Sequence, residues 1–370
     1  MKQDLAEGLL IKIMGWANDR VVEERPRLDR MARFKYDEYQ QFGPGQKFIE
    51  ALCLWLSQFE TADERERAFD FVRQRLVFIS SDDMRHLVEV SFPDVIRPTL
   101  IARTAEQIGA SPHRLMQVIR DPAYSRALRS TLFLGLSDGS RMDVFRRSAN
   151  LDNEQVWQAY EISGAKSAGM LKDLRKAVAD PEARFERVIL IDDFSASGIS
   201  YIRKEGADWK GKAVKAIKQF HSDGDARLLA NYPNIDMHII LYVATHSAVN
   251  YIREQLKLYS DETSIQCPSV SAVYELPPEL SLTAPRDANF LSLVDDDKYY
   301  RERPLDEHES KGAKGDKNAT VKRGFAGCAL PLVLAHNCPN NSVYLLWADP
   351  LEENSARGLF PRVVRHREPS

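Results

Sequence analysis

The chain has 370 residues, and since domains usually span about 100–200 residues, we expect two domains or one large domain with appendages. Hydrophobic residues make up 44% and charged residues 28% of the sequence, a composition that excludes intrinsic disorder as the main state. The net charge of −3 excludes binding to nucleic acid through overall charge alone. With four cysteines and no apolar stretch of about 18 residues, we expect a cytoplasmic protein without a disulfide framework or a membrane span.

Residues 1–128 are predicted to form a helical region. Apolar side chains recur at helical spacing from Phe48 to Phe59. Thr61, with Glu64 three residues later, is typical of a capped helix start. Further helix starts are predicted at Ser80-Ser81 and at Ser111-Pro112, the latter with proline at the first helical position. These helices are expected to form a bundle or to pack on the next domain.

Residues 129–275 show short apolar runs that alternate with helical stretches. Buried apolar strands separated by helices indicate an α/β fold with a parallel sheet covered on both faces. Helices are predicted near 166–179 and 246–258, and strands at 131–136, 155–162, 187–191, 237–243 and 269–274.

Residues 276–370 are predicted to form a C-terminal extension. Its charged segment, at about 295–320, favours a mobile loop. The apolar runs 327–334 and 342–347 are expected to fold back on the core. The polar run His336–Asn341 between them is interpreted either as a hood over a binding site or as a structural turn.

The segment 188–200 carries the strongest functional signal. Four apolar residues predict a buried strand, and Asp192 and Asp193 follow at its carboxyl end, where open α/β sheets bind ligands. A loop of small residues comes next, and a helix is predicted to begin near Ser200. Backbone N–H groups, hydroxyls and the helix N-terminus could together surround a phosphate. The predicted phosphate-binding residues are Ser195, Ala196, Ser197, Gly198, Ile199 and Ser200. The alternative is that the two aspartates only end a strand and solvate a turn.

This string resembles the phosphoribosyltransferase signature, which it matches at Asp192-Asp193, Ser197-Gly198 and Ser200. It departs at Ile199, where the signature usually has a second glycine. The resemblance implies a type I phosphoribosyltransferase-like core at 129–275 that binds phosphoribosyl diphosphate (PRPP) at the carboxyl edge of its sheet. It also implies that Asp192 and Asp193 are catalytic, and that Mg²⁺ is held near them through the substrate diphosphate.

The resemblance further implies that the loop after the first strand binds diphosphate. The residues at that place are Gly135, Ser137, Asp138, Gly139, Ser140 and Arg141; the alternative is an ordinary turn. The glycine-bearing segment 163–169 follows the second strand and is short for a lid, with Lys166 placed to meet the diphosphate. His246, in an Ala-Thr-His turn after the fourth strand, is expected either to contact the ligand or to cap the following helix.

The ends of the chain suggest a narrower resemblance. The segments 78–81, 330–333 and 336–342 look like those of phosphoribosyltransferase-like proteins from bacterial antiphage conflict systems, including retron-type operons. That likeness implies an effector or accessory role with protein partners from a defence operon, such as a reverse transcriptase or an ATPase.

Two functions remain open from the sequence. The first is an enzyme, a pentosyltransferase that transfers ribosyl phosphate to a nitrogenous acceptor or to water. The second is an inactive module that senses a nucleotide or acts as a scaffold for a protein or nucleic-acid partner. The basic stretch Arg203–Lys218 could contact nucleic acid, although a solvated helical face is the commoner outcome. A zinc site at Cys328, His336 and Cys338 is disfavoured, because structural zinc needs four ligands.

Overall fold

A computed structural model describes residues 3–221, 225–231, 235–300, 305, 307–312, 319–348 and 356–362. The chain divides into two compact units: unit 1 contains Met1–Asp83 and Glu279–Ser370, and unit 2 contains Met84–Pro278. In the described ranges, no helix is long and apolar enough to cross a membrane.

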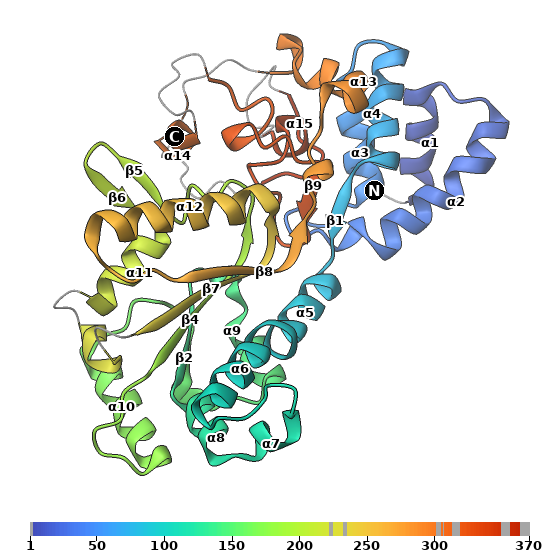
Figure 1. Cartoon of the computed structure of the whole chain (residues 1–370). Helices are drawn as coiled ribbons and strands as arrows, with labels where there is room; N and C mark the ends of the chain where they lie inside the picture. Colours follow the sequence, from blue (N-terminus) through green and yellow to red (C-terminus); the bar gives the residue numbers. More distant parts are fainter. Residues whose placement is uncertain are drawn as a thin grey trace. The chain divides into compact units, whose positions relative to one another are not determined.

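Unit 2 is built on a parallel five-stranded sheet with the order β3-β2-β4-β7-β8, and most of its strands can be followed side by side in Figure 1. This sheet confirms the predicted α/β class with a parallel core. The strands are β2 (Thr131–Gly135), β3 (Val156–Trp157), β4 (Arg187–Ser195), β7 (Asp236–Thr245) and β8 (Ser269–Leu276). The second strand in chain order, β3, is much shorter than the predicted 155–162, because only Val156 and Trp157 pair with β2.

Helices cover both faces of this sheet. On one face, α10 (Gly164–Val178), α11 (Lys212–His221) and α12 (His246–Thr263) enclose a core with alternate residues of the strands, among them Leu190 and Leu241. On the other face, Phe133 contacts Phe145 of α9 (Met142–Ser148), with ring centroids 5.3 Å apart. Burial on both faces is the reason that the central strands β2, β4 and β7 are rich in apolar residues.

The remaining elements of unit 2 precede or connect the strands. They are α5 (Ser81–Val90), η2 (Ser91–Ile96), α6 (Arg97–Gln107), α7 (Leu115–Arg120), α8 (Pro122–Arg129), η3 (Asp138–Ser140), η4 (Asn153–Gln155), β5 (Arg203–Glu205), β6 (Asp208–Lys210) and η5 (Asp225–Leu229). The predicted start at Ser80 is confirmed, because its hydroxyl accepts a 2.9 Å hydrogen bond from Asp83 N. The predicted start at Ser111-Pro112 is wrong: α7 begins at Leu115, after a turn closed by a 3.0 Å bond from Arg114 N to Ser111 O.

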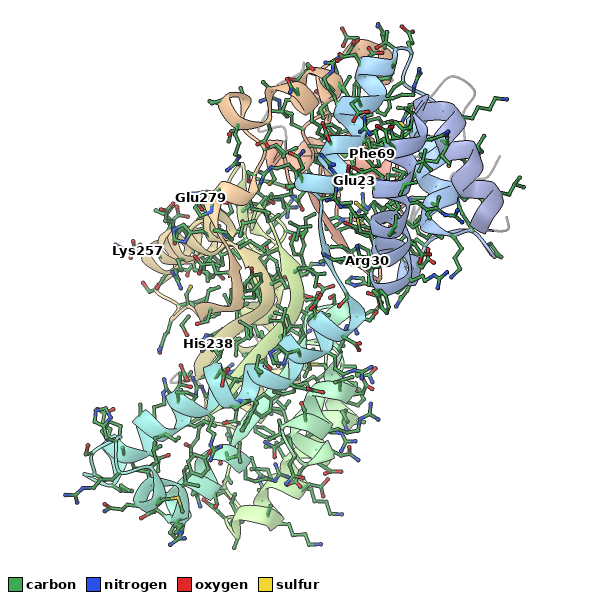
Figure 2. All side chains as sticks on the ribbon, turned by 90° about the vertical axis from the view of Figure 1, so that its right-hand side faces the viewer. Glu23, Arg30, Phe69, His238, Lys257 and Glu279 are labelled. Atoms are coloured by element: carbon green, nitrogen blue, oxygen red, sulfur yellow. The ribbon has the colours of Figure 1, made fainter. Side chains whose placement is uncertain are left out.

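Unit 1 combines both ends of the chain around an aromatic core. Phe69 lies inside it, whereas Glu23 and Arg30 of α2 are exposed (Figure 2). Its elements are α1 (Gln3–Met14), α2 (Asn18–Phe34), η1 (Tyr36–Glu38), α3 (Phe48–Leu56), α4 (Ala62–Gln74), β1 (Val77–Ile79), η6 (Pro278–Leu280), α13 (Ala284–Val294), η7 (Asp297–Tyr299), α14 (Glu307–Gly312), η8 (Phe325–Gly327), β9 (Leu332–Leu334) and α15 (Tyr344–Trp347).

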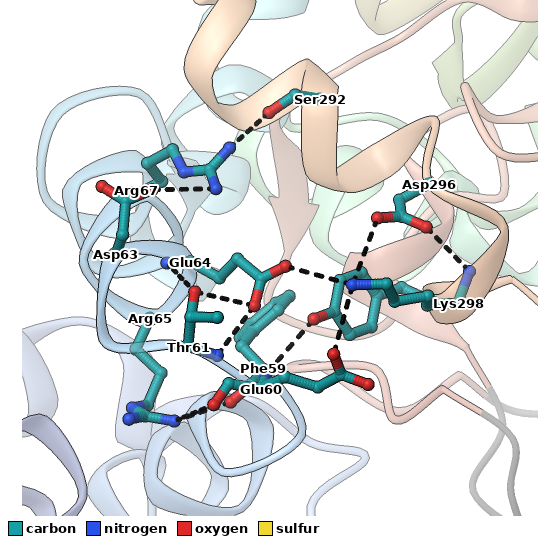
Figure 3. A network of polar contacts seen from close by, with 11 residues as sticks. Phe59, Glu60, Thr61, Asp63, Glu64, Arg65, Arg67, Ser292, Asp296 and Lys298 are labelled. Atoms are coloured by element: carbon teal, nitrogen blue, oxygen red, sulfur yellow. Dashed lines mark hydrogen bonds and ion pairs between the residues drawn. The ribbon is translucent and has the colours of Figure 1, made fainter.

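A polar network joins the start of α4 to the segment around η7 (Figure 3). The predicted cap is confirmed: Thr61 N donates to Glu64 Oε2 at 2.8 Å, and Glu64 N donates to Thr61 Oγ1 at 3.1 Å. Lys298 Nζ lies 3.2 Å from Glu60 Oε2, and Tyr299 is buried. The beginning of the predicted loop at about 295–320 is therefore packed within unit 1. Residues 301–304, 306 and 313–318 of that prediction lie outside the described residues.

The two sequence stretches that form unit 1 are also joined by a pair of strands. β1 and β9 form a parallel two-stranded sheet in which Val77, Phe78 and Ile79 lie opposite Leu332, Val333 and Leu334. The division into units thus differs from the three consecutive regions 1–128, 129–275 and 276–370. Residues 84–128 belong to the same unit as the sheet, and both C-terminal apolar runs pack in unit 1.

The polar run His336–Asn341 contributes to the interior of unit 1. Cys338 is fully buried, and Asn341 Nδ2 donates to Phe325 O at 3.3 Å. Asn340 O accepts a 2.7 Å bond from Phe325 N. These contacts favour the structural turn over the hood.

Candidate functional site

The strand order reverses between β2 and β4, since the chain moves from β2 to β3 on one side and then to β4 on the other. Open α/β sheets bind ligands outside the carboxyl ends of the strands at such a switch point. The loop after β2 and the two aspartates of β4 both lie there. The structure therefore brings together the predicted diphosphate loop and the predicted acidic pair.

Asp192 and Asp193 lie within β4, which continues to Ser195 and pairs there with Ala244. Side chains of successive strand residues point to opposite faces of a sheet. Asp192 accordingly contacts Lys212 of α11, whereas Asp193 lies against Gly139 of η3. The two carboxylates are neighbours in the chain but have separate surroundings.

Asp192 is fully buried and surrounded by donors. Its Oδ1 accepts hydrogen bonds from the Ser137 hydroxyl and, at 3.2 Å, from Asp193 N. Its Oδ2 accepts from Tyr201 Oη at 2.5 Å and from Lys212 Nζ at 2.6 Å. Burial, opposed by the Lys212 ammonium, raises the pKa of Asp192 above its ordinary value. A carboxylate offers about four acceptor positions, so this one is fully used within the protein.

Asp193 is only partly buried. Its Oδ1 accepts a 2.8 Å hydrogen bond from Phe194 N. A Cβ atom placed on Gly139 would lie 2.1 Å from Asp193 Oδ2, so a larger residue there would force this carboxylate to move. Asp193 is thus the better placed of the two aspartates to meet a ligand, while the predicted role of both as hydroxyl acceptors stays a prediction.

The loop after β2 is held firmly to the neighbouring strands. Ser140 Oγ donates to Ile191 O at 2.7 Å, and Ser140 O accepts from Tyr242 Oη at 2.8 Å. Arg141 has a left-handed backbone with φ of 47° and is partly exposed. Gly135 is needed for packing, because a Cβ atom there would lie 2.5 Å from Gln158 O. Asp138 is exposed at the tip of the loop.

The predicted phosphate loop begins with Ser195 as the last residue of β4. Thr245 Oγ1 donates to Ala196 O at 2.6 Å and accepts from Ala248 N at 3.0 Å, so the N-cap of α12 also holds this loop. Gly198 has a φ of 74°, and a Cβ atom on it would lie 2.7 Å from Tyr251 Cδ1. Ser197, Ile199 and Ser200 complete the turn.

The helix predicted near Ser200 is wrong. The hairpin of β5 and β6 is inserted after the turn, and α11 begins only at Lys212. The hairpin returns the chain to the loop, where Lys212 N donates to Ser200 O at 3.0 Å and Ala213 N donates to Tyr201 O at 2.9 Å. The first N–H groups of α11 are therefore bound within the turn, and the expected helix N-terminus does not follow the loop directly.

Lys166 and His246, the other residues predicted to contact the ligand, each contact neighbouring side chains. Segment 163–169 forms the start of α10, with Ser163 as its cap, and Lys166 Nζ lies 4.5 Å from the ring centre of Trp157. His246 pairs through Nδ1 with Glu275 of β8, and its Nε2 lies 2.8 Å from Asn250 Nδ2. The cap of α12 is Thr245, so His246 does not cap this helix, and its contact with a ligand stays a prediction.

Two side chains of this site, those of Tyr201 and Lys212, were not predicted from the sequence. Tyr201 is fully buried, and its burial and the nearby Asp192 carboxylate raise its pKa well above the ordinary value, so it remains a hydrogen-bond donor. Lys212 was assigned to the basic stretch Arg203–Lys218, and only its place at the first residue of α11 brings it to Asp192.

The other cations of that stretch are largely paired. Arg203 and Lys210 lie 2.5 Å and 2.6 Å from Glu205, and Lys204 lies 2.6 Å from Glu262. A nucleic-acid contact there stays a prediction, and these ion pairs lower the charge available for it.

Metal binding by the protein alone has little support in this region. Among the described residues, no group of three or more His, Cys, Asp or Glu side chains could hold a metal ion. Mg²⁺ is often bound by one or two carboxylates together with substrate phosphates. The donor set fits that arrangement through Asp193, since the oxygens of Asp192 already accept from four donors.

Comparison with known protein families gave a match. A family model described as PRTase-CE matches residues 52–362, a range that includes parts of both units. A search of curated proteins and a search of solved structures each gave no match. Because the family match covers most of the sequence, the chain belongs to the PRTase-CE family, a phosphoribosyltransferase-like family.

Proposed function

We propose that this protein binds PRPP or a related ribose phosphate at the carboxyl edge between β2 and β4, and transfers the ribosyl phosphate to a nitrogenous acceptor. One observation carries the proposal: the Ser137–Arg141 loop and the aspartates of β4 meet at the switch point of the sheet, with Ser137 bound to Asp192 and Gly139 against Asp193. Membership of a phosphoribosyltransferase-like family supports the same ligand class.

Different residues of the site would bind different parts of the ligand. Asp193 would accept hydrogen bonds from the ribose hydroxyls, and the loop that ends at Arg141 would face the diphosphate. The turn from Ala196 to Ser200 would receive the 5′-phosphate. Mg²⁺, when bound with the ligand, would neutralise diphosphate charge near Asp193.

The proposed reaction breaks the bond between ribose C1 and the diphosphate oxygen, and the electron pair leaves with the diphosphate. A bond from C1 to the acceptor nitrogen forms, and the acceptor loses a proton to the solvent. Catalysis of this kind depends on positioning and on charge stabilisation rather than on a protein nucleophile. With water as the acceptor, the same site would hydrolyse its ligand.

A second candidate is a module that binds a nucleotide without turning it over. The saturated carboxylate of Asp192 favours it, because only Asp193 of the acidic pair is then placed to meet the ribose.

Calorimetry tests the proposal, with PRPP and with ribose 5-phosphate, each in the presence and absence of Mg²⁺. We expect PRPP to bind more tightly with Mg²⁺, and Asp193→Asn to weaken both ligands. Diphosphate release in the presence of extracted nucleobases would support transfer, whereas binding without release would support the sensing module. Failure of the wild-type protein to bind any sugar phosphate would contradict both.

We further propose that the protein acts in antiphage defence together with protein partners. Support comes from the segments around Phe78 and Leu332, which carry the likeness to conflict-system proteins and pair as β1 and β9. Phage challenge of cells that express the chain with its neighbouring genes provides the test. Protection that is lost with Asp193→Asn is expected, and equal plaque counts with and without the wild-type gene would contradict this role.

A further inference from the structure

We propose that Lys212 is the cation that binds the 5′-phosphate of the ligand, and that Asp192 is a positioning residue that holds Lys212 rather than a residue that binds the ribose. This inference rests on the proposed function, because it assigns parts of the same site.

The first step is that Asp192 has no acceptor position left for a ribose hydroxyl. Its carboxylate is 0% exposed and accepts from Ser137, Tyr201, Lys212 and the Asp193 backbone N–H. Since a carboxylate has about four acceptor positions, a ligand hydroxyl could enter only by displacing one of these donors.

The second step is that Lys212 retains donors and access to solvent. Its ammonium has three N–H donors, of which one reaches Asp192 Oδ2 at 2.6 Å. The Lys212 side chain is 33% exposed, while that of Asp192 is fully covered. Its Nζ also lies 5.3 Å from the ring centre of Tyr201, which fixes the direction of the side chain. The ammonium is thus held by Asp192 on its buried side, and the side chain that carries it is partly exposed.

The third step is that Lys212 stands beside the predicted phosphate turn. Its backbone N–H donates to Ser200 O at 3.0 Å, and the turn is closed by a 2.9 Å bond from Tyr201 N to Gly198 O. The hairpin between Tyr201 and Lys212 therefore brings a cation from a distant chain position to the turn, in the place where a helix N-terminus was expected. A phosphate dianion in that turn would interact with the full positive charge of the Lys212 ammonium instead of the partial charge of a helix N-terminus.

Replacing Lys212 alone would leave a buried carboxylate uncompensated, so the neutral pair Asp192→Asn/Lys212→Met is the informative variant. Lys215→Met is the matched control, because Lys215 is an exposed cation on the same helix. Binding of ribose 5-phosphate and of inorganic phosphate is measured by calorimetry. We expect the double variant to bind both at least about tenfold more weakly, since hydrogen bonds to charged groups are strong, and Lys215→Met to bind like wild type.

Asp193→Asn separates the two roles. It should weaken ribose 5-phosphate while leaving inorganic phosphate unchanged, whereas the double variant should weaken both. If the double variant binds ribose 5-phosphate as tightly as wild type does, the role of Lys212 is wrong and the proposed function stands. If wild type binds no sugar phosphate, the proposed function itself is wrong.

A measurement on the wild-type protein is independent of how any variant folds. Acetylation of lysines is followed by peptide mass spectrometry with and without ribose 5-phosphate. The ligand should protect Lys212 and leave the rate at Lys215 unchanged. Equal acetylation of Lys212 in both samples, under conditions where calorimetry shows saturation, would overturn the inference.

Discussion

Asp192 and Asp193 differ in what their charges contribute to the stability of the fold. Asp192 forms a buried ion pair with Lys212, and removing one partner of such a pair typically costs about 3–5 kcal/mol; since Lys212 is 33% exposed, we expect the lower end for Asp192→Asn. Asp193 is partly exposed, and Asp193→Asn should change the free energy of unfolding by less than about 1 kcal/mol. Urea denaturation of the two variants measures both values.

The neutral double variant is the control for this comparison. Asp192→Asn/Lys212→Met removes both charges of the ion pair. Its loss in free energy of unfolding should therefore be smaller than the sum of the losses in the single variants Asp192→Asn and Lys212→Met. Strictly additive losses would show that the 2.6 Å contact contributes no coupling energy, and similar losses for the two aspartates would contradict their different burial.

Gly198 gives a second prediction about stability. Its φ of 74° and the close approach of Tyr251 leave no room for a Cβ atom. A non-glycine residue in such a backbone conformation costs about 1–3 kcal/mol, so Gly198→Ala should destabilise the protein by at least that amount. Gly169→Ala is the control, because nothing lies within 4 Å of its added Cβ and alanine favours a helix by roughly 0.5–1 kcal/mol. Equal melting temperatures for the two variants would contradict this account of Gly198.

The acidic residues and the turn after them were predictable from the sequence, because four apolar residues followed by Asp192-Asp193 form a local pattern. The different surroundings of the two carboxylates were not, because the predicted strand ends at 191 whereas β4 continues to Ser195. Tyr201 reaches Asp192 from the turn before the β5–β6 hairpin and Lys212 from the first residue after it, and no periodic pattern in the sequence links either residue to Asp192.

The sheet was predictable from the sequence because buried parallel strands are apolar runs of typical strand length. The helix after Ser200 was not, because the hairpin of β5 and β6 interrupts the usual order of strand, loop and helix. Pairing in that hairpin joins Arg203 to Lys210 and Lys204 to Trp209, and Trp209 is anchored by a 2.8 Å bond to Glu262. Such contacts between strands and with a distant helix leave no periodic signal in a short polar segment.

The amino end of β7 gives a prediction about pH. His238 is buried near Arg187 and Asp236, and its Nε2 lies 3.0 Å from Ser271 Oγ. Burial, followed by the Arg187 charge, lowers the pKa of His238 from 6.5 to about 4. Between these values the unfolded state binds the additional proton, so the free energy of unfolding should fall as the pH falls, by up to about 3 kcal/mol.

Unfolding by urea at several pH values between 7 and about 4 tests this in wild type and in His238→Gln. The variant keeps a polar group for Ser271 but does not titrate, so its stability should fall less steeply. Carboxylates with lowered pKa values, such as Asp287, contribute the same slope to both proteins. Parallel curves would show that His238 is not responsible.

The division of the chain into two units was the hardest feature to predict from the sequence. Composition suggested successive regions along the chain, but β1 pairs with β9 across more than two hundred intervening residues, and both ends form unit 1. A three-residue strand of common apolar residues carries no information about so distant a partner. The boundary before unit 2 was equally hidden, because helices α5 to α8 have the same local pattern as the helices of unit 1.

The division into units predicts which part of the chain folds by itself. Unit 2 is one continuous stretch with its own apolar core on the sheet, whereas unit 1 is assembled from two separated stretches. A fragment of residues 80–278 should therefore fold without the rest, and it begins at Ser80 because that hydroxyl caps α5. Circular dichroism and a cooperative urea transition provide the measurement, with the fragment 1–83 as the control that should lack such a transition. If the fragment 80–278 shows no cooperative transition, residues outside unit 2 are needed for the sheet to form. If the fragment folds and binds ribose 5-phosphate in calorimetry as tightly as the full chain does, the residues of the candidate site are sufficient for binding.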